Sequence, residues 1–343
     1  MLVLQVIDTL KLGGAERVAV DITNLLYSKN INVKLIVLKS EGELKFQINK
    51  NIDVIYLPYR NKFNPLFWFY LYKSLKKSNI IHVHMRHNYA KIKILSLFTK
   101  LKAKIIFHDH FGDIHFNKKV PIYLKSYIVP TYYIGVSNEL LLWAKSKLKI
   151  NSDNSFILSN TIFRDPNFKK LKVSQEKRII CVSNLRPTKN LELAIKIAND
   201  SNIKLDIVGQ VINIEYYKKL KKIANNKIQF ITNCSDIFNI LHKYDLAIHT
   251  AFSETGPLVI LEYLKFGLNF LTFNSGEVPR KVENELPFSI VNSHELNEWK
   301  KKLSNLFLNP YSKKKLHQVY EDKFGVNAYY EKLMQIYESV LKK

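Results

Sequence analysis

Hydrophobic residues along the chain fall into short continuous runs separated by longer segments of helical period. In chain order the runs are LVLQVI, NVKLIVL, NIDVIYL, NIIHVHM, KIIFH and YYIGVS, followed by RIICVSN, IKLDIVG, KIQFIT, DLAIHT and NFLTF. Apolar runs that do not alternate with polar residues are typical of parallel strands buried on both faces, with helices covering those faces. Two such sets of strands predict an α/β chain with two doubly wound sheets.

A polar stretch at residues 159–178 separates the two sets of strands. We therefore predict an N-terminal domain over residues 1–165 and a C-terminal domain over residues 166–320, and a length of 343 residues suits two domains of ordinary size. The last segment, residues 321–343, has apolar residues at helical spacing and no strand after it, which predicts a C-terminal helix.

Composition and charge narrow the class of protein. Cys181 and Cys234 are the only cysteines, and no CxxC motif or histidine cluster at metal spacing occurs, so we expect neither a disulfide framework nor a zinc site. The chain has no apolar stretch long enough to span a bilayer and no signal-peptide pattern, which favours a cytoplasmic protein. The net charge of +24 predicts an anionic partner, namely nucleic acid, nucleotide phosphates or an acidic membrane surface.

The residues that follow each strand carry the candidate chemistry, because open parallel sheets bind ligands at the carboxyl ends of their strands. After the first strand, Gly13 and Gly14 precede a helix whose free amides suit an anion, although a plain strand-to-helix turn also uses glycine. No GxGxxG, GxxxxGKS, GxxxxGKT or GxSxG motif occurs. Ordinary dinucleotide enzymes, P-loop enzymes and α/β-hydrolases are therefore disfavoured.

Two later strand ends add titratable groups. In IIFHDHFGD, His108 and His110 point to the same side of an extended chain, where a neutral imidazole can orient or deprotonate a hydroxyl. The alternative is a histidine that is only hydrogen-bonded to a neighbouring loop. In NLRPTKN, Arg186 and Lys189 form a turn after a strand, where two cations suit a diphosphate. Surface solvation would also account for Lys189.

The stretch SETGPLVILEYLKFG places two carboxylates around an apolar helix. The preceding strand ends before Ser253, while Pro257 suits the first helical turn and Gly267 the exit. Glu254 then lies in the loop and Glu262 inside the helix, so the free amides between them suit phosphate and the carboxylates suit sugar hydroxyls. A capping carboxylate and an unrelated surface glutamate would give the same spacing.

Four short motifs, in chain order, carry a family resemblance. They are GGAERV, the histidine of FHDH, NLRPTKN and ETGPLVILE, supported by the lesser matches GVSNEL, SNTI, YDLAIHTAFSE and FGLNFLTFNSGEVP. From Leu2 to about Tyr337 the chain resembles the retaining glycosyltransferases of family 4, which have the GT-B fold. The resemblance implies two Rossmann-like domains facing across a cleft, with the acceptor on the N-terminal domain, the donor on the C-terminal domain and the last helix returning to the N-terminal domain.

The resemblance also implies roles for individual residues. Glu254 contacts the donor sugar and Glu262 holds the ribose, while Arg186 and Lys189 neutralise the leaving diphosphate. The other expected contacts to the nucleotide-sugar are the backbone amides around Gly13, Gly14, Thr255, Gly256, Pro257, Leu258 and Val259.

Three positions need comment against the family pattern. His110 aligns best with the catalytic-site histidine, and His108 is the reserve. Asn184 stands where the family usually has arginine, and Arg186, two residues further on and on the same side of an extended segment, is placed to supply the guanidinium. Arg280 stands where a glutamate is common, which leaves the role of that loop open.

The implied activity is that of a retaining hexosyltransferase. It moves a sugar from a nucleotide-sugar, with UDP favoured, to a glycan or lipid-linked glycan of a bacterial surface polysaccharide such as lipopolysaccharide or capsule. Front-face displacement is the implied mechanism, without a cofactor or metal, and no DxD motif occurs. A nucleotide-sugar epimerase of GT-B fold is the alternative. A basic nucleic-acid-binding protein is a distant one, since no nucleic-acid motif accompanies the charge.

Two segments suggest contact with a membrane. Residues 60–79 and 117–133 place aromatic residues beside lysines. Such surfaces can sit on anionic lipid, which suits a peripheral enzyme that extends a polyprenyl-linked glycan at the inner face of the cell membrane. The alternative is that the aromatic residues belong to the core and only the lysines face water.

Overall fold

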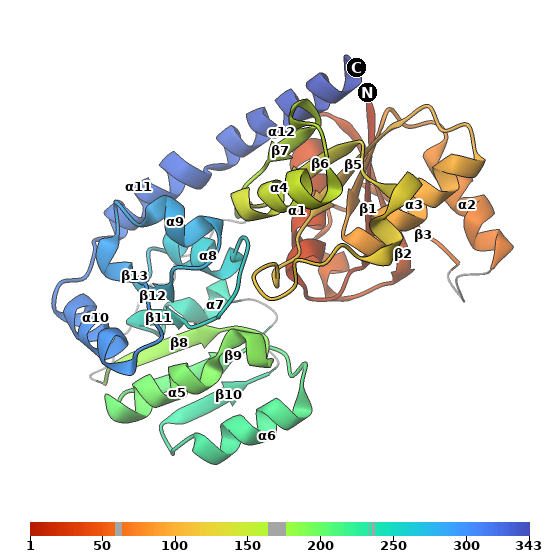
Figure 1. Cartoon of the computed structure of the whole chain (residues 1–343). Helices are drawn as coiled ribbons and strands as arrows, with labels where there is room; N and C mark the ends of the chain where they lie inside the picture. Colours follow the sequence, from red (N-terminus) through yellow and green to blue (C-terminus); the bar gives the residue numbers. More distant parts are fainter. Residues whose placement is uncertain (59–63, 164–175, 233, 235–236) are drawn as a thin grey trace. The chain divides into compact units, whose positions relative to one another are not determined.

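The computed structural model describes residues 1–58, 64–163, 176–232, 234 and 237–343. The chain divides into two compact units, one formed by Met1–Phe163 with Asn327–Lys343 and the other by Arg164–Val326. The predicted boundary between residues 165 and 166 lies outside the described residues. Each unit is an α/β structure built on one parallel sheet, as the hydrophobic runs predict (Figure 1).

The first unit has a seven-stranded parallel sheet in the order β3-β2-β1-β4-β5-β6-β7. Its strands are β1 (Leu2–Thr9), β2 (Asn32–Ser40), β3 (Asp53–Tyr56), β4 (Ile80–His84), β5 (Lys104–Asp109), β6 (Tyr132–Gly135) and β7 (Ser155–Ile157). Its α-helices are α1 (Gly14–Ser28), α2 (Pro65–Leu75), α3 (Arg86–Phe98), α4 (Asn138–Trp143) and α12 (Val326–Leu341).

The second unit has a six-stranded parallel sheet in the order β10-β9-β8-β11-β12-β13. Its strands are β8 (Arg178–Val182), β9 (Lys204–Val208), β10 (Ile228–Ile231), β11 (Leu246–His249), β12 (Phe270–Phe273) and β13 (Ile290–Val291). Its α-helices are α5 (Leu191–Asp200), α6 (Ile214–Ile223), α7 (Phe238–Leu241), α8 (Leu258–Phe266), α9 (Glu277–Val282), α10 (Leu296–Leu308) and α11 (Lys313–Phe324).

Both faces of the first sheet are buried, which explains why its strands are continuously apolar. Leu4 and Val6 of β1 pack into one hydrophobic cluster, whereas Ile7 packs into another with Leu35 of β2. Successive side chains of a strand point to opposite faces, so two covered faces favour apolar residues on both sides of the strand. The edge strands β7 and β13 are too short to show this pattern, so the hydrophobic runs do not predict them.

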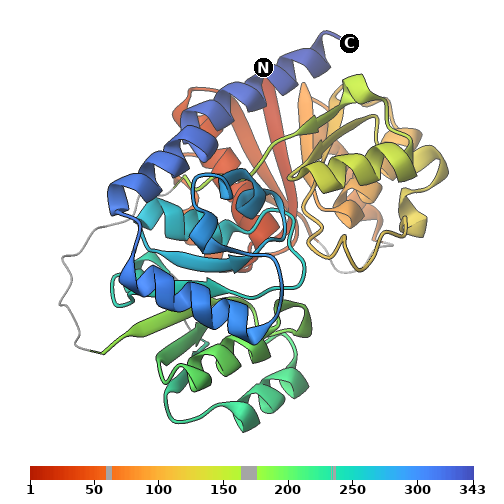
Figure 2. The same ribbon diagram turned by 60° about the vertical axis from the view of Figure 1, so that its left-hand side comes forward.

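Helix α12 returns to the first unit, as the fold class predicted from sequence implies, and it lies along that unit's sheet in both views (Figures 1 and 2). The helix begins at Val326, after a break at Gly325, so the first residues of the predicted C-terminal segment belong to α11 instead. Tyr337 of α12 is fully buried. Its hydroxyl accepts a hydrogen bond from Gln5 Nε2 at 3.0 Å and lies 2.7 Å from His82 Nδ1. One polar contact therefore joins the two ends of the chain.

No helix among the described residues is long and apolar enough to cross a membrane.

Replacement of Tyr337 by phenylalanine should lower the free energy of unfolding by about 1 to 3 kcal/mol, because Gln5 Nε2 and His82 Nδ1 would each lose a buried partner and keep only their 3.4 Å contact with each other. Tyr329, on the same helix and equally buried, is the matched control, because its hydroxyl has no hydrogen-bond partner among the described residues. Tyr329→Phe should be neutral or stabilising. Urea unfolding of both variants measures the difference, and equal losses would contradict this account.

Candidate active site

Strands β8 and β11 are neighbours at the point where the strand order of the second sheet reverses direction. The connections that follow these two strands leave in opposite directions, and the crevice between them is where open α/β sheets bind ligands. The loop after β8 carries Lys189 and the loop after β11 carries Glu254. The fold thus brings two of the predicted site residues to one place.

Lys189 and Glu254 form a largely buried ion pair. Lys189 Nζ donates a hydrogen bond to Glu254 Oε1, and His249 Nε2 lies 3.3 Å from the same oxygen. The lysine and glutamate side chains are 11% and 14% exposed. Burial opposes ionisation of Glu254, but the charge of Lys189 and the hydrogen bond from His249 outweigh burial and lower the pKa of the carboxyl to about 2. Glu254 is therefore an ionised hydrogen-bond acceptor at neutral pH.

Three strand-end loops hold Glu254 in position. Thr250 Oγ1 donates a hydrogen bond to the carbonyl of Asn190 at 2.9 Å, which ties the β11 loop to the β8 loop. The amide of Glu254 donates to Ser275 Oγ, in the β12 loop, at 2.9 Å. Gly276 has φ +88°, and a Cβ there would lie 3.0 Å from the carbonyl oxygens of Glu254 and the next residue. A side chain at this glycine would therefore push the β11 and β12 loops apart.

Helix α8 places the second carboxylate of the motif. Pro257 is the N-cap that precedes its first residue, Leu258, and Gly267 ends it at φ +76°, as the sequence predicts. Glu262 is 3% exposed, so it is a buried residue and not the surface glutamate of the alternative interpretation. The other predicted donor contacts are buried at Thr255 and Pro257 and half-buried at Gly256, Leu258 and Val259.

Asn184, the residue that departs from the family pattern, lies in the loop after β8. Asn184 Oδ1 accepts a hydrogen bond from the amide of Gln210 at 3.3 Å, which joins the ends of β8 and β9. Arg186 is half-buried and precedes the short turn that ends at Lys189. Arg280 is exposed on α9. The replacement of the family arginine by Arg186 stays a prediction.

In the first unit, Gly13 is the N-cap of α1 and Gly14 its first residue, directly after β1. Glu16 lies over this helix start: a Cβ on Gly13 would be 2.1 Å from Glu16 Oε2, and Thr9 Oγ1 donates to Glu16 Oε1 at 3.5 Å. Burial raises the pKa of the Glu16 carboxyl. Gly13 thus makes room for a carboxylate, and a phosphate bound to these helix amides would share them with Glu16.

Four histidines meet at the carboxyl ends of β4 and β5. His82 and His84 lie on one face of β4, and His84 is in register with His108 of β5. His110 follows β5, and neighbouring rings in the group have centroids 4.2 to 5.3 Å apart. Ring nitrogens of the first three lie within 4.8 Å of one another, so the expectation of no histidine cluster at metal spacing is wrong. Strand register, which sequence spacing does not reveal, brings these residues together.

Two family models match the chain. The model described as Glycosyltransferase Family 4 matches residues 12–149, and the model described as Glycosyl transferases group 1 matches residues 163–323. Together these matches span both units and all four motifs that carry the resemblance. The chain belongs to the family 4, or group 1, glycosyltransferases.

Similar proteins support this assignment. The glycosyltransferase is 24% identical to a Haemophilus influenzae protein described as an uncharacterized glycosyltransferase, over 87% of this chain and 88% of that protein. HepE of Anabaena, solved in complex with UDP and glucose, has a TM-score of 0.81 at 15% identity, with 99% of this chain and 100% of HepE covered. The lipopolysaccharide outer core galactosyltransferase WaaB has a TM-score of 0.73 at 14% identity, with 99% of each chain covered. These structures confirm the GT-B fold class.

The histidines of this glycosyltransferase form a hydrogen-bonded stack. His82 Nε2 lies 3.0 Å from His108 Nδ1, and His84 Nδ1 lies 2.9 Å from His110 Nε2. Burial lowers the pKa of all four rings, to about 3 for His82 and His110, so they are neutral at pH 7. Each contact contains one shared proton, which a metal ion would have to displace. The arrangement fits hydrogen bonding, and we assign no metal to it. His108 is fully buried and His110 half-buried, which favours His110 as the residue that meets substrate.

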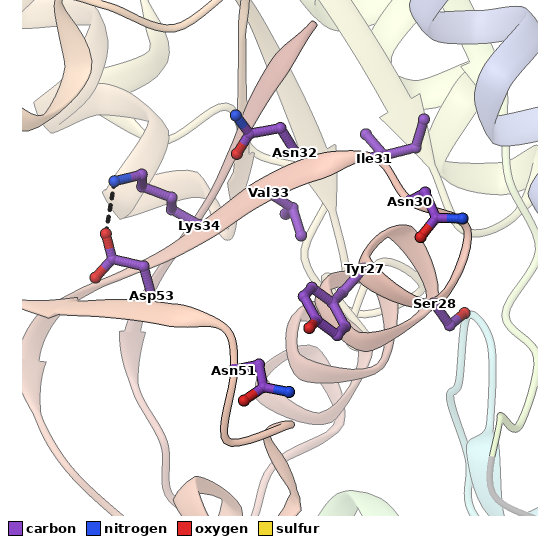
Figure 3. Close-up of a pocket in the computed structure, with 9 residues that line it drawn as sticks. All are labelled: Tyr27, Ser28, Asn30, Ile31, Asn32, Val33, Lys34, Asn51 and Asp53. Carbon is purple, nitrogen blue, oxygen red and sulfur yellow. Dashed lines mark hydrogen bonds and ion pairs between the residues drawn. The ribbon is translucent and has the colours of Figure 1, made fainter.

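A hollow of about 540 Å³ lies elsewhere on the first unit (Figure 3). Its lining includes Tyr27 near the end of α1, Asn32 at the start of β2 and Asp53 at the start of β3, where Lys34 Nζ contacts Asp53 Oδ2 at 2.6 Å. These residues lie at the amino ends of the strands, whereas the glycosyltransferase motifs follow the carboxyl ends. We therefore do not assign this hollow to the active site.

Four residues of the site were not predicted from sequence: Gln5, His82, His84 and His249. Each is a polar residue inside a buried apolar run, in LVLQVI, NIIHVHM and DLAIHT. A buried polar side chain requires a hydrogen-bond partner. A polar residue inside an apolar run is therefore the sequence feature that could have identified these positions.

Glu254→Gln should lower the free energy of unfolding at pH 7 by about 3 kcal/mol, because it removes an ionised partner of Lys189. A carboxyl whose folded pKa is depressed contributes stability above its unfolded pKa and loses it as the pH falls. The difference from wild type should therefore shrink from about pH 4.5 towards pH 2. Denaturant unfolding over this range measures it, and a difference that does not change with pH would contradict the assignment.

Proposed function

We propose that this glycosyltransferase is a retaining enzyme that transfers a sugar from a UDP-sugar to a glycan or polyprenyl-linked glycan during synthesis of a bacterial surface polysaccharide. The observation that carries the proposal is the Lys189–Glu254 pair at the strand reversal of the second sheet. HepE, with UDP and glucose, supports the choice of nucleotide, and WaaB, a lipopolysaccharide galactosyltransferase, supports the pathway class.

The charges of the pair suit the two parts of a nucleotide-sugar. Lys189 supplies the positive charge that stabilises a departing diphosphate, together with Arg186 from the same loop. Glu254 accepts hydrogen bonds from sugar hydroxyls. Because Lys189 and Glu254 hold each other without a donor, the arriving diphosphate takes over Lys189 Nζ and frees the carboxylate for the sugar. Glu262, buried in α8, is the proposed partner of the ribose.

Front-face displacement is the proposed mechanism, because the family resemblance implies it. In this step the bond from the anomeric carbon to the diphosphate breaks, and the acceptor oxygen bonds to the same face of the sugar. The leaving phosphate oxygen takes the acceptor proton. We also propose that no metal is needed, since two cationic side chains and the first amides of α8 balance the diphosphate charge.

Lys189→Ala should reduce turnover of the UDP-sugar roughly 100- to 1,000-fold, because the charge it supplies acts mainly in the transition state. Lys196→Ala is the matched control: it removes the same charge from an exposed position on α5 and should leave turnover unchanged. Phosphorus NMR of nucleotide release, with and without a glycan acceptor, measures both variants. Normal turnover by Lys189→Ala would remove this residue from the mechanism, and equal release without acceptor would favour the epimerase.

The membrane contact predicted from sequence is also part of the proposal. In α2, Phe67 is core, whereas Phe69 and Tyr70 are exposed beside Lys73. Arg60 and Lys62 of the same predicted segment lie outside the described residues.

The second predicted segment has a similar surface. Ile122 and Tyr127 are each 84% exposed, and Lys118, Lys119 and Lys125 accompany them. Exposed apolar and aromatic side chains among lysines suit the headgroup region of an anionic bilayer.

Replacement of both Ile122 and Tyr127 by serine should weaken binding to vesicles that contain anionic lipid at low salt, with solution turnover retained. Leu308→Ser removes an equally conspicuous exposed side chain, 77% exposed, from α10 in the second unit and serves as the control. Co-sedimentation measures binding. If wild type fails to bind these vesicles, or the double variant binds as well as wild type, the membrane proposal falls.

A further inference from the structure

Two hydrogen bonds lead from the first strand of the chain to His110. Gln5 Oε1 lies 2.8 Å from His84 Nε2, and His84 Nδ1 lies 2.9 Å from His110 Nε2. Gln5 and His84 are fully buried in β1 and β4, so neither ring nor amide is free to turn toward water. His110 is thus reached by a chain of side chains from two neighbouring strands.

With the Gln5 amide oxygen toward His84, the chain of hydrogen bonds admits one arrangement of protons when the rings are neutral. An amide oxygen only accepts, so His84 carries its proton on Nε2 and has a lone pair on Nδ1. That lone pair accepts from His110, which places the His110 proton on Nε2. Nδ1 of His110 is then the unprotonated nitrogen, which can accept a hydrogen bond.

The orientation of the Gln5 amide determines this outcome. If the amide were reversed, its nitrogen would donate to His84 Nε2, and both histidine tautomers would switch. In the orientation that the structure has, the Tyr337 hydroxyl accepts from Gln5 Nε2 at 3.0 Å and donates its own proton to a lone pair on His82 Nδ1 at 2.7 Å, and Gln5 Nε2 also lies 3.4 Å from that nitrogen. Helix α12 therefore contributes to the tautomer of a residue on the β5 loop.

The backbone around the two histidines is fixed independently. Arg86, two residues after His84, donates to Asp109, the residue before His110, from Nε at 3.0 Å and from Nη2 at 2.8 Å, which joins the ends of β4 and β5. Met85 is held at φ +72°, a conformation that is unfavourable for a residue with a side chain and persists only where its surroundings fix it. The strand ends are thus rigid enough for the hydrogen bond between His84 and His110 to persist.

We propose that Gln5 and His84 are positioning residues, held by Tyr337, that keep His110 protonated on Nε2 and present its Nδ1 as the acceptor for a substrate hydroxyl. This inference rests on the proposed function only in giving His110 a substrate to meet. A histidine in the wrong tautomer would donate where it must accept. The proposal therefore explains why polar residues occupy a strand face that would otherwise be apolar.

The test uses the tautomer itself as a readout. Nitrogen NMR of the full chain labelled in histidine should show His110 with its proton on Nε2 in wild type and in His84→Asn, whose amide oxygen replaces the Nδ1 acceptor. His84→Leu removes the acceptor and should lose this preference, with kcat reduced roughly 10- to 100-fold and KM little changed, while His84→Asn recovers most of the loss. His242→Leu is the control, since it removes an imidazole at the end of α7 in the second unit and should leave the His110 tautomer and kcat unchanged.

The outcomes separate the two proposals. A His110 proton on Nδ1 in wild type, or a tautomer that His84→Leu leaves unchanged, would overturn the positioning role. Normal turnover by His110→Ala, with the tautomers as predicted, would instead overturn the role of His110 in the reaction and leave the hydrogen-bond relay intact. Thermal unfolding of each variant checks that it is folded, and the His84→Asn rescue distinguishes positioning from a loss of packing.

Discussion

The ion pair between Lys189 and Glu254 is the interaction on which the candidate donor site depends. Two opposite charges that are mostly withdrawn from water stabilise a protein only when each stays paired and hydrogen-bonded. Here the carboxylate gains a second partner in His249, and the loop that carries it is fixed by Ser275 and Gly276. The pair therefore holds two loops at the strand reversal of the second sheet in the geometry that a nucleotide-sugar would meet. The ion pair also keeps both side chains charged. A bound nucleotide-sugar would replace it, with the diphosphate contacting Lys189 and the sugar hydroxyls contacting Glu254.

A second polar network has a comparable place in the first unit. Gln5, His82, His84 and Tyr337 are all fully buried, and each would be costly without its partners. The network has one imperfection: Nε2 of His108 has no hydrogen-bond partner among the described residues. A face lined with leucine would be easier to stabilise. The histidines at the carboxyl ends of β4 and β5 are therefore explained by what their hydrogen bonds reach, which is His110.

Much of this structure could be predicted from the order of residues. The continuous apolar runs identify most strands of both sheets, because strands covered on two faces leave few positions for polar residues. The placement of Lys189 and Glu254 after two of those strands was also readable, since parallel strands present their carboxyl ends at one edge. The strand β13 was not readable, because two residues at a sheet edge carry too short a pattern.

The contacts between segments lay beyond the sequence. His84 and His110 are 26 positions apart, and only the register of β4 against β5 makes them neighbours. The coverage of the α1 amides by Glu16 likewise depends on a side-chain conformation that the GGAERV motif does not specify. Asn184 looked like a loss relative to the family pattern, yet it joins the ends of β8 and β9.

The central claim, that the β8 and β11 loops bind a nucleotide diphosphate through Lys189, is tested most directly by calorimetric titration. Wild type, Lys189→Ala and Lys196→Ala should each be titrated with UDP, GDP and dTDP under the same conditions. The account predicts that UDP binds wild type and Lys196→Ala with the same affinity and binds Lys189→Ala at least tenfold more weakly, a loss of about 1.4 kcal/mol. Absence of binding by any of the three nucleotides to wild type, or equal UDP affinity for wild type and Lys189→Ala, would contradict it.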